Sequence, residues 1–420
     1  MRCLGVCYGG GHSKIISAIL DEGSNYSDIN FKIIALTTAW EDLKAYNNFN
    51  NIEVVQLSHF KPLFKDFKDE ISQIGNELLI DLGENSKIEK DESAFYLGLS
   101  MLDLIQKIGE KKAYLKYESN NRGAFLQTIS ALKIITAEMP DIVFATNSPR
   151  FEKALILAAK KKNIFTFQIN DLFAEEAGEI ISDNIITMNH HVAKDIISLR
   201  PYSNCVPLGQ PALENSISKI NEVKRDKKND GLRKTQITWF TQKAVKRDNE
   251  GKIVGFYDQR LIIDEYFSLF KKILNKNPQL QISIRVHPSE SQEFYESIFS
   301  DIGVSVINSG FNIYESIAFS DIILVDDSTV GVEGVLAGKT VLTYRKFGEI
   351  HQRFKRPPFI NLNSTKEIFE FITRYERSEK RAPQNKFELT PNASKNIINW
   401  AITEWNKHNN INHEPIHNRK

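Results

Sequence analysis

The sequence has few cysteines and no excess of either charge. Its 420 residues include only Cys3, Cys7 and Cys205. Cys3 and Cys7 do not have the C-x-x-C spacing, so we expect neither a disulfide framework nor a redox pair, and we expect a reducing, cytoplasmic location. Lys and Arg number 54 against 53 Asp and Glu, which gives a net charge of +1. This balance argues against a protein that binds nucleic acid through a basic face, but it does not exclude small anionic ligands.

Long apolar runs are also missing. No window approaches the roughly 18 uninterrupted apolar residues that a spanning helix needs. The segment from Met1 to Tyr8 is too short, and too soon followed by glycines, for a signal peptide. Any membrane contact is therefore expected to be peripheral.

One segment offers such a peripheral contact. Phe60, Phe64 and Phe67 share a helical face, and lysines at positions 61, 65 and 68 surround it, as in helices that dock on a membrane surface. The alternative is an amphipathic helix packed on a sheet with its lysine stems along the apolar surface. Acidic residues at positions 66, 69 and 70 dilute the positive charge and favour this alternative.

What is present is ordinary globular composition, with 41% apolar and 25% charged residues, and the length predicts two or three domains. Short apolar runs alternate with longer helical patterns, which predicts an α/β protein with parallel, doubly wound sheets. An N-terminal domain over 1–208 contains the strands predicted at 2–8, 31–36, 52–57, 141–145, 164–169, 184–188 and 205–208. A helical insertion is expected at about 61–140.

The second half repeats this organisation. Residues 209–235 are expected to form a linker, because the stretch from Asn221 to Lys234 lacks a packable apolar face. The second domain, 236–392, has strands predicted at 236–240, 280–286, 304–307, 321–325 and 340–344, with helices starting at Asp258, Ser289, Asn312 and Ser328. A closing helix and a polar tail are expected over 393–420.

The first strand leads into a glycine-rich loop. Gly9, Gly10 and Gly11 precede His12, and a helical pattern follows. Consecutive glycines after a parallel strand let a ligand approach the backbone. The loop matches neither the Walker pattern nor G-x-G-x-x-G, which disfavours an ordinary kinase or dehydrogenase. His12 could accept a proton from an acceptor hydroxyl, or it could cap the helix.

Two further motifs follow strands of the second domain. Pro288 cannot extend a ladder, so His287 lies at the carboxyl end of its strand, where open α/β sheets bind ligands. The alternative is a buried structural histidine. After the strand at 321–325, Ser328 and Thr329 stand where a helix begins and could meet a phosphate, or act as a plain N-cap. Glu333 could accept from ribose hydroxyls, and Lys243 lies in a basic loop that could hold the phosphates.

These motifs resemble the GT-B glycosyltransferase superfamily over nearly the whole chain. The Arg285-x-His287-Pro288 strand end and the Ser328-Thr329-x-Gly331-x-Glu333 helix start carry the resemblance. The segment Val325 to Arg345 is similar to non-hydrolysing UDP-GlcNAc 2-epimerases. The His-Pro and Ser-Thr motifs also resemble bacterial sialyltransferases and capsule or teichoic acid transferases. The loop at Gly10 resembles that of the lipid-linked GlcNAc transferase of peptidoglycan synthesis.

The resemblance implies two Rossmann-like domains facing across a cleft, and it assigns the site residues. The nucleotide-sugar donor, UDP- or CMP-linked, would contact Arg285, His287, Pro288, Ser328, Thr329, Gly331, Glu333 and Lys243. The substrate residues would be Gly10, Gly11, Asn147 and Arg150, and the base would be His12, Asp171 or Glu175. No Asp-x-Asp stands at a strand end, so no obligatory metal is expected.

The implied function is transfer of a sugar to a glycan or lipid-linked acceptor in bacterial surface polysaccharide synthesis, such as capsule or lipopolysaccharide. The alternatives are an epimerase or hydrolase of UDP-GlcNAc, a CDP-alcohol phosphotransferase of the teichoic acid type, and a nucleotide-sugar sensor without turnover. The epimerases open with a Gly-Thr-Arg-Pro-Glu loop that is absent here. Their His-x-Glu-Ala-Gly motif is replaced by Gln168-Ile169-Asn170-Asp171, which favours the transferase.

Overall fold

The computed structural model describes residues 1–79, 88–147, 149–226, 234–247, 253–308, 310–355, 357–375 and 388–413. The chain forms two compact units. Unit 1 comprises Met1–Glu214 and Leu389–Lys420, and unit 2 comprises Asn215–Glu388. Helix α9 (Pro211–Asp226) begins in unit 1 and continues into unit 2. The segment expected to be a linker is therefore helical up to residue 226.

Unit 1 is built on a seven-stranded parallel sheet in the order β3-β2-β1-β4-β5-β6-β7. Its strands are short and apolar because helices cover both faces. The order reverses between β1 and β4, so that ligand-binding loops are expected beside these two strands. The strands are β1 (Arg2–Cys7), β2 (Asn30–Ala35), β3 (Ile52–Val55), β4 (Ile142–Ala145), β5 (Phe165–Ile169), β6 (Asn184–Ile186) and β7 (Cys205–Val206).

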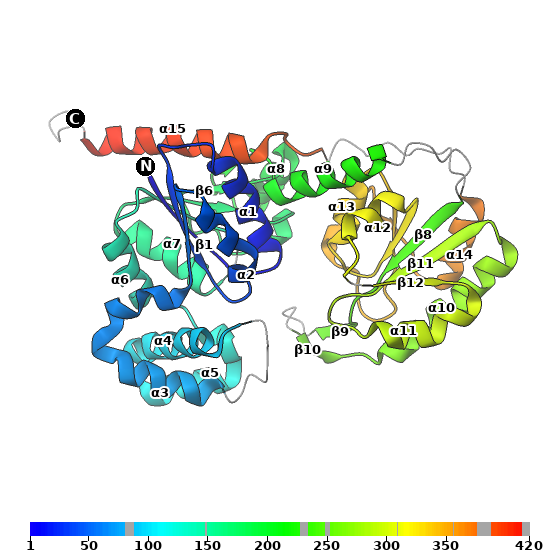
Figure 1. Ribbon diagram of the computed structural model, residues 1–420, viewed down its shortest axis with the longest axis horizontal. Coiled ribbons are helices and arrows are strands. Elements are labelled where there is room, and N and C mark those ends of the chain that lie inside the picture. The colour runs from blue at the N-terminus through cyan, green and yellow to red at the C-terminus, as the bar shows by residue number, and fades with distance from the viewer. Residues whose placement is uncertain are drawn as a thin grey trace. The chain divides into compact units, whose positions relative to one another are not determined.

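Two buried apolar clusters cover the two faces of this sheet. The C-terminal helix belongs to one of them, because Ile397, Ile398 and Ala401 of α15 (Ala393–His413) pack with Ile15 and Ile19 of α1. Figure 1 shows α15 running beside α1. The remaining helices outside the insertion are α1 (Gly11–Gly23), α2 (Ala39–Leu43), η1 (Lys44–Asn48), α6 (Thr128–Glu138), α7 (Phe151–Lys161), η5 (Ala174–Glu176) and α8 (His190–Leu199).

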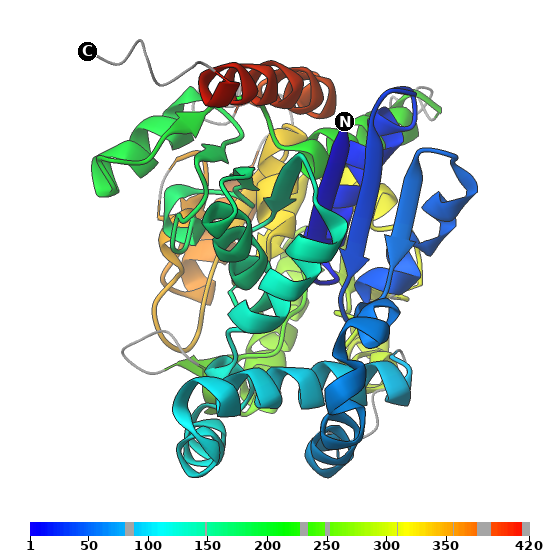
Figure 2. The same ribbon diagram turned by 90° about the vertical axis from the view of Figure 1, so that its left-hand side faces the viewer.

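The helical insertion lies between β3 and β4, as predicted, and its helices gather at one end of the sheet (Figure 2). It contains η2 (Leu57–Phe67), α3 (Lys68–Leu79), α4 (Lys90–Ile108), α5 (Glu110–Asn120) and η4 (Asn121–Ala124). Phe60 and Phe64 are each 3% exposed and pack in the core, and Phe67 packs partly buried against it. The aromatic face of this segment is therefore part of the core, which supports the packed amphipathic helix over the membrane-docking face.

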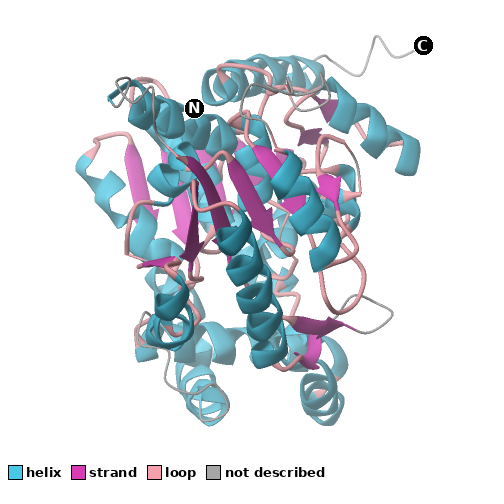
Figure 3. Cartoon of the chain, turned by 90° about the vertical axis from the view of Figure 1, so that its right-hand side faces the viewer, coloured by secondary structure: helices cyan, strands magenta, loops and turns pink. Residues whose placement is uncertain are grey.

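Unit 2 has a six-stranded parallel sheet in the order β12-β11-β8-β13-β14-β15 and a separate antiparallel hairpin, β9–β10. Figure 3 shows helices packed around these strands. The strands are β8 (Thr235–Phe240), β9 (Val245–Arg247), β10 (Ile253–Phe256), β11 (Leu280–Arg285), β12 (Ser305–Ile307), β13 (Ile322–Val325), β14 (Thr340–Thr343) and β15 (Ile360–Asn361). The helices are α10 (Gln259–Lys276), α11 (Gln292–Phe299), η6 (Ser300–Ile302), α12 (Ile313–Phe319), α13 (Val330–Leu336), η7 (Gln352–Phe354) and α14 (Thr365–Arg374).

Three details of the prediction differ from the structure. The helix expected from Ser289 begins at Gln292, because the side chain of Ser291 accepts a hydrogen bond from the Phe294 N–H and acts as the N-cap. Strands β9, β10 and β15 were not predicted. Residues 389–392 belong to unit 1, and the expected polar tail beyond residue 413 lies outside the described residues.

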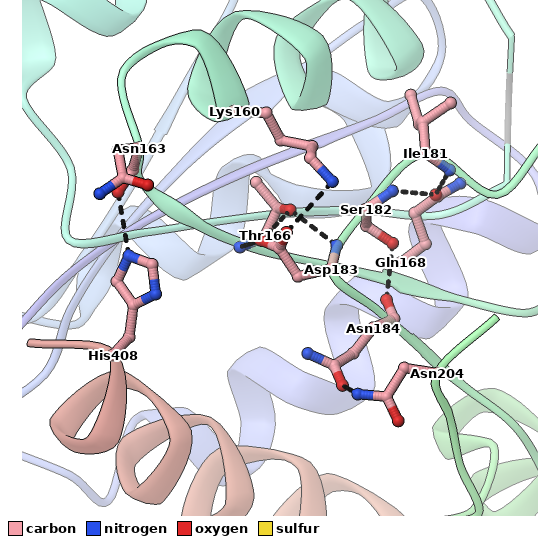
Figure 4. Close-up of polar contacts among 10 residues, drawn as sticks. All are labelled: Lys160, Asn163, Thr166, Gln168, Ile181, Ser182, Asp183, Asn184, Asn204 and His408. Carbon is pink, nitrogen blue, oxygen red and sulfur yellow. Dashed lines mark hydrogen bonds and ion pairs between the residues drawn. The ribbon is translucent and has the colours of Figure 1, made fainter. Parts of the chain in front are cut away.

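Side chains hold the long connection between β5 and β6 in place (Figure 4). Gln168, which is 4% exposed, accepts hydrogen bonds from the N–H groups of Ile181 (2.9 Å) and Ser182 (3.0 Å). Asp183 accepts from the Thr166 hydroxyl at 2.7 Å and pairs with Lys160 at 3.1 Å. Buried, satisfied polar contacts of this kind fix a loop in one conformation. They set the course of the segment that starts with Asn170 and Asp171.

Candidate functional site

In unit 1, three neighbouring strands carry the polar side chains of the candidate site. Val6 of β1 pairs in register with Ala145 of β4, which pairs with Gln168 of β5. The loops after these strands therefore start level at one edge of the sheet. They carry His12, Thr146 and Asp171, of which His12 lies more than a hundred residues before the other two in the sequence.

His12 lies between two carboxylates. Its Nδ1 is 3.6 Å from Glu152 Oε1, and its Nε2 is 3.5 Å from Asp171 Oδ2. Nδ1 also contacts the Thr146 hydroxyl, which donates to Glu152 Oε2 at 2.7 Å. Carboxylates on both sides stabilise the positive charge that an imidazole gains when it accepts a proton. The arrangement suits a general base whose ring is held by a buried acid.

Glu152 is completely buried in the first turn of α7. Its Oε1 accepts a hydrogen bond from the Tyr8 N–H at 3.1 Å. Burial raises the pKa of Glu152 above the ordinary value, while His12, Thr146 and the Tyr8 N–H act in the opposite direction. The sequence prediction missed this residue. Its only local signal is one acid at the start of an apolar helix, and its contact with His12 depends on the pairing of β1 with β4.

The glycine loop leaves open space beside His12. A Cβ at Gly10 or Gly11 would meet nothing within 4 Å, whereas one at Gly9 would overlap the Thr38 hydroxyl. Gly10 has φ +78°, which favours glycine. A cavity of about 970 Å³ adjoins the loop, and its lining includes Gly10, Lys14 and Asp42. The loop thus has the room for a ligand that the sequence analysis predicted.

The other predicted residues of unit 1 fall into two groups. Asp171 contacts His12, and Asn147 follows β4 and donates to Asn170 at the same edge. Glu175 has an exposed side chain on η5, so of the two acids proposed as bases, Asp171 is the one beside His12. Arg150 occupies the N-cap position of α7 without a side-chain capping hydrogen bond, and its guanidinium lies 4.7 Å from the centre of the Tyr8 ring.

In unit 2, the strands that precede the predicted phosphate residues also end level. Arg285 of β11 and Val325 of β13 are both register partners of Phe240 in β8, which lies between them. Two strand spacings separate β11 from β13 by roughly 10 Å. The loops with His287 and Ser328 therefore start at one sheet edge, at a separation that a sugar diphosphate can bridge.

His287 is exposed, and its local contacts determine which ring nitrogen can reach a ligand. Its Nδ1 accepts from the Ser289 N–H at 3.2 Å and lies 2.7 Å from the Ser289 hydroxyl. In the neutral ring the proton is then on Nε2, which is a donor. The His287 N–H donates to Thr241 Oγ1 at 2.9 Å, which fixes the backbone turn. His287 can thus present an N–H group to a phosphate oxygen.

Ser328, Thr329 and Glu333 lie along the loop after β13 and the start of α13. Thr329 is exposed and makes no side-chain capping hydrogen bond, whereas the half-buried Ser328 accepts through its hydroxyl oxygen from the Val330 N–H at 3.4 Å. Glu333 accepts from the Ser216 hydroxyl of α9 at 2.9 Å. Lys243 is exposed in the loop after β8, with Nζ 6.0 Å from the centre of the Phe256 ring.

Arg285 and Gly331 each make close contacts within unit 2. Arg285 is 7% exposed and donates to the carbonyls of Asn308 (3.3 Å) and Phe311 (2.5 Å), so it secures the β12–α12 loop. A Cβ on Gly331 would lie 3.1 Å from Phe354 and Val325, so this glycine allows α13 to pack closely on the sheet. Pro288 directly follows His287 and lies three residues beyond the end of β11 at Arg285.

A buried acidic pair beside Ser328 was not predicted. Asp326 and Asp327 lie 3.9 Å and 3.7 Å from the guanidinium of Arg345. Burial raises the pKa of Asp326 to about 7; Arg345 opposes this shift and Asp327 adds to it. The pair therefore sets the charge of the loop that leads into the predicted phosphate residues.

Within the described residues, no group of three or more His, Cys, Asp and Glu side chains is arranged to hold a metal ion. Across that same part of the chain, no helix has both the length and the apolar character needed to cross a membrane.

No protein-family model and no curated protein matches the sequence. Solved structures match the fold along nearly its whole length. The UDP-GlcNAc 2-epimerase of Neisseria meningitidis bound to UDP-GlcNAc has a TM-score of 0.59 and 15% identity, and the match covers 96% of this chain and all of that one. The epimerase of Methanocaldococcus jannaschii gives a TM-score of 0.59 at 14% identity, over 96% and 100%.

MurG from Acinetobacter baumannii matches with a TM-score of 0.53 at 12% identity, over 96% of this chain and 99% of that one. Together with the two mostly parallel sheets, these matches confirm the α/β GT-B fold predicted from the sequence. At this identity the likeness concerns the fold, and the chemistry must be argued from the side chains.

Proposed function

We propose that the protein is a glycosyltransferase that moves a sugar from a nucleotide-activated donor, UDP- or CMP-linked, to a hydroxyl of a glycan or lipid-linked acceptor. The observation that carries the proposal is His12 held between Glu152 and Asp171 at the strand edge of unit 1. A histidine so placed can take the proton of an attacking hydroxyl, an effect worth roughly 100- to 10,000-fold in rate.

Unit 2 would bind the donor. The His287 Nε2–H and the hydroxyls of Ser328 and Thr329 start from strand ends about 10 Å apart, which suits the phosphates of a nucleotide sugar. The fold likeness supports a nucleotide-sugar ligand, since the meningococcal epimerase is bound to UDP-GlcNAc and the M. jannaschii epimerase to UDP-GlcNAc and UDP.

In the proposed reaction the acceptor oxygen forms a bond to the anomeric carbon of the donor sugar. The bond between that carbon and the phosphate oxygen breaks, and the phosphate leaves with the electron pair. His12 accepts the proton of the acceptor, and Glu152 orients the ring and stabilises its positive charge. His287, Ser328 and Thr329 stabilise the charge that develops on the leaving phosphate, which is the main electrostatic task.

An epimerase-like reaction on UDP-GlcNAc is the second candidate, because several matching structures are UDP-GlcNAc 2-epimerases. The experiment that separates the two is incubation with UDP-, GDP-, CDP- and CMP-linked sugars, with and without acceptors, while nucleotide release is followed. Acceptor-dependent release supports the transferase. A new product from UDP-GlcNAc alone supports the epimerase, and binding without any turnover contradicts both. A thermal-shift screen identifies the nucleotide, since tight binding stabilises the folded chain.

A further inference from the structure

A second cavity in unit 1, of about 340 Å³, lies at the end of β1 next to the site of His12. It is formed between the sheet edge and the helical insertion. Its lining residues are Tyr8, Gly9, Thr37, Thr38, Ile88, Tyr96, Arg122 and Arg150. Two of these are arginines and none is acidic. The neighbouring 970 Å³ cavity, by contrast, is lined by Glu41, Asp42 and Glu89 as well as Lys14.

In the part of the chain that the structure describes, neither arginine of this cavity has an acidic partner. Among the described residues, no hydrogen bond or ion pair involves the guanidinium of Arg122 or Arg150. Arg150 lies 4.7 Å over the Tyr8 ring, which holds its plane in place and leaves the N–H groups at its edge available. The positive charges of two guanidinium groups on one small cavity repel each other. A bound oxyanion would offset this repulsion and accept paired hydrogen bonds from the guanidinium groups.

The backbone of the cavity wall has an unusual conformation at two points. Arg150 has φ +67° and Thr37 has φ +54°. Positive φ is uncommon for residues other than glycine, and for the β-branched Thr37 it is a clear outlier. Strained backbone of this kind is concentrated at ligand-binding sites. The cavity is also connected to the proton acceptor, because Tyr8 donates its N–H to Glu152, which contacts His12.

We infer that this cavity binds an oxyanion of the acceptor, a carboxylate or a phosphate carried by a sugar-sized group, through Arg122 and Arg150. The assignment of this oxyanion to the acceptor rests on the proposed function. Binding of an anion in the cavity can be tested without any turnover. Tyr8 and Tyr96, whose hydroxyls lie 2.9 Å apart, also line the cavity and supply neutral hydrogen-bond partners. An anion bound here would place the rest of the acceptor near His12.

Binding of three probes tests the inference, each titrated into the full-length protein and followed by ligand-observed NMR: glucuronate, glucose 6-phosphate and neutral glucose. We expect one or both anionic sugars to bind at least tenfold more tightly than glucose, and the preferred anion distinguishes carboxylate from phosphate. Arg122→Gln and Arg150→Gln should each reduce that binding at least tenfold. Arg150→Lys, which keeps the charge without the paired donors, should recover part of it, and Lys112→Gln on the exposed face of α5 is the matched control.

Equal binding of all three sugars, or unchanged anion binding in both arginine variants that remain folded by circular dichroism, overturns the inference. The proposed function can fail separately. If no nucleotide sugar is turned over and yet anion binding depends on both arginines, the cavity is an anion site and the proposed transferase function is wrong. If neutral acceptors are glycosylated with the same KM by the wild type and both arginine variants, the protein is a transferase, but the inference of an anionic acceptor is wrong.

Discussion

Glu152 Oε1 lies 3.6 Å from His12 Nδ1, so a fully buried carboxylate contacts the one histidine of the glycine loop. Glu152 does not face the ligand space itself and acts through His12 as a positioning residue. The contact joins the loop after β1 to the first turn of α7.

Glu152→Gln keeps the shape of the side chain and removes its charge. We expect kcat to fall by roughly 100- to 10,000-fold, because the ring of His12 loses the charge that stabilises its protonated form. The Kd for nucleotide should be unchanged. Steady-state kinetics over a range of pH, together with calorimetric titration of the nucleotide, provide the check. Glu175→Gln, on the exposed η5 turn, is the control and should stay close to wild type; an equal loss in both variants would contradict the role of Glu152.

His12→Ala should spare nucleotide binding and reduce turnover to a similar extent, since the proposed base acts on the acceptor. Asp171→Asn should lower kcat less than His12→Ala does, because Asp171 supports the ring from its Nε2 side at 3.5 Å. Both are measured as nucleotide release and as nucleotide Kd. If His12→Ala instead abolishes nucleotide binding, unit 1 binds the donor and the assignment of the two units is reversed.

His287→Ala and Ser328→Ala should each weaken nucleotide binding by about 10- to 100-fold, which corresponds to roughly 1.5–3 kcal/mol for hydrogen bonds to a charged group. Calorimetric titration with the nucleotide found in the thermal-shift screen measures the effect. Lys355→Ala, whose exposed ammonium pairs with Glu349 in the same unit, is a matched control. Unchanged affinity in both site variants would place the phosphates elsewhere.

Much of the fold could be predicted because buried parallel strands leave a strong local signal. Runs such as Ile322–Val325 have apolar residues on both faces and end in polar loops. Strands β9, β10 and β15 have only two to four residues, which is too few for a recognisable local pattern. The sequence pattern did not show that the expected linker is helical up to residue 226, because few apolar residues, among them Leu213 and Ile220, supply the buried face of α9.

The site was predicted where a motif follows a strand directly, as with His12 and His287. The roles of Glu152 and Arg285 could not be predicted, since each depends on what the fold places beside it. Arg285 follows the pattern of a phosphate ligand in the sequence, but its guanidinium is used by the carbonyls of Asn308 and Phe311. A sequence motif shows which side chains reach a sheet edge, whereas the tertiary contacts decide which of them remain available to a ligand.

Asp326 makes the stability of unit 2 depend on pH. Its pKa in the folded chain is about 7, above the ordinary value of 3.8, chiefly because of burial. Between these two values the folded chain keeps the proton while the unfolded chain releases it. The folded state therefore binds more protons, and this residue's contribution to stability falls as pH rises from about 4 to 7.

Asp326→Asn removes this titration while it keeps the size of the side chain. We expect the difference in unfolding free energy, variant minus wild type, to be about 1–3 kcal/mol more positive at pH 8 than at pH 4.5, since each pKa unit corresponds to about 1.4 kcal/mol. Urea unfolding at the two pH values measures the difference. Asp264→Asn, an exposed acid paired with Arg260 in the same unit, should show almost no such change. A difference that is the same at both pH values would mean that the Asp326 carboxyl releases its proton at the same pH in the folded chain as in the unfolded chain, contrary to the pKa that burial raises.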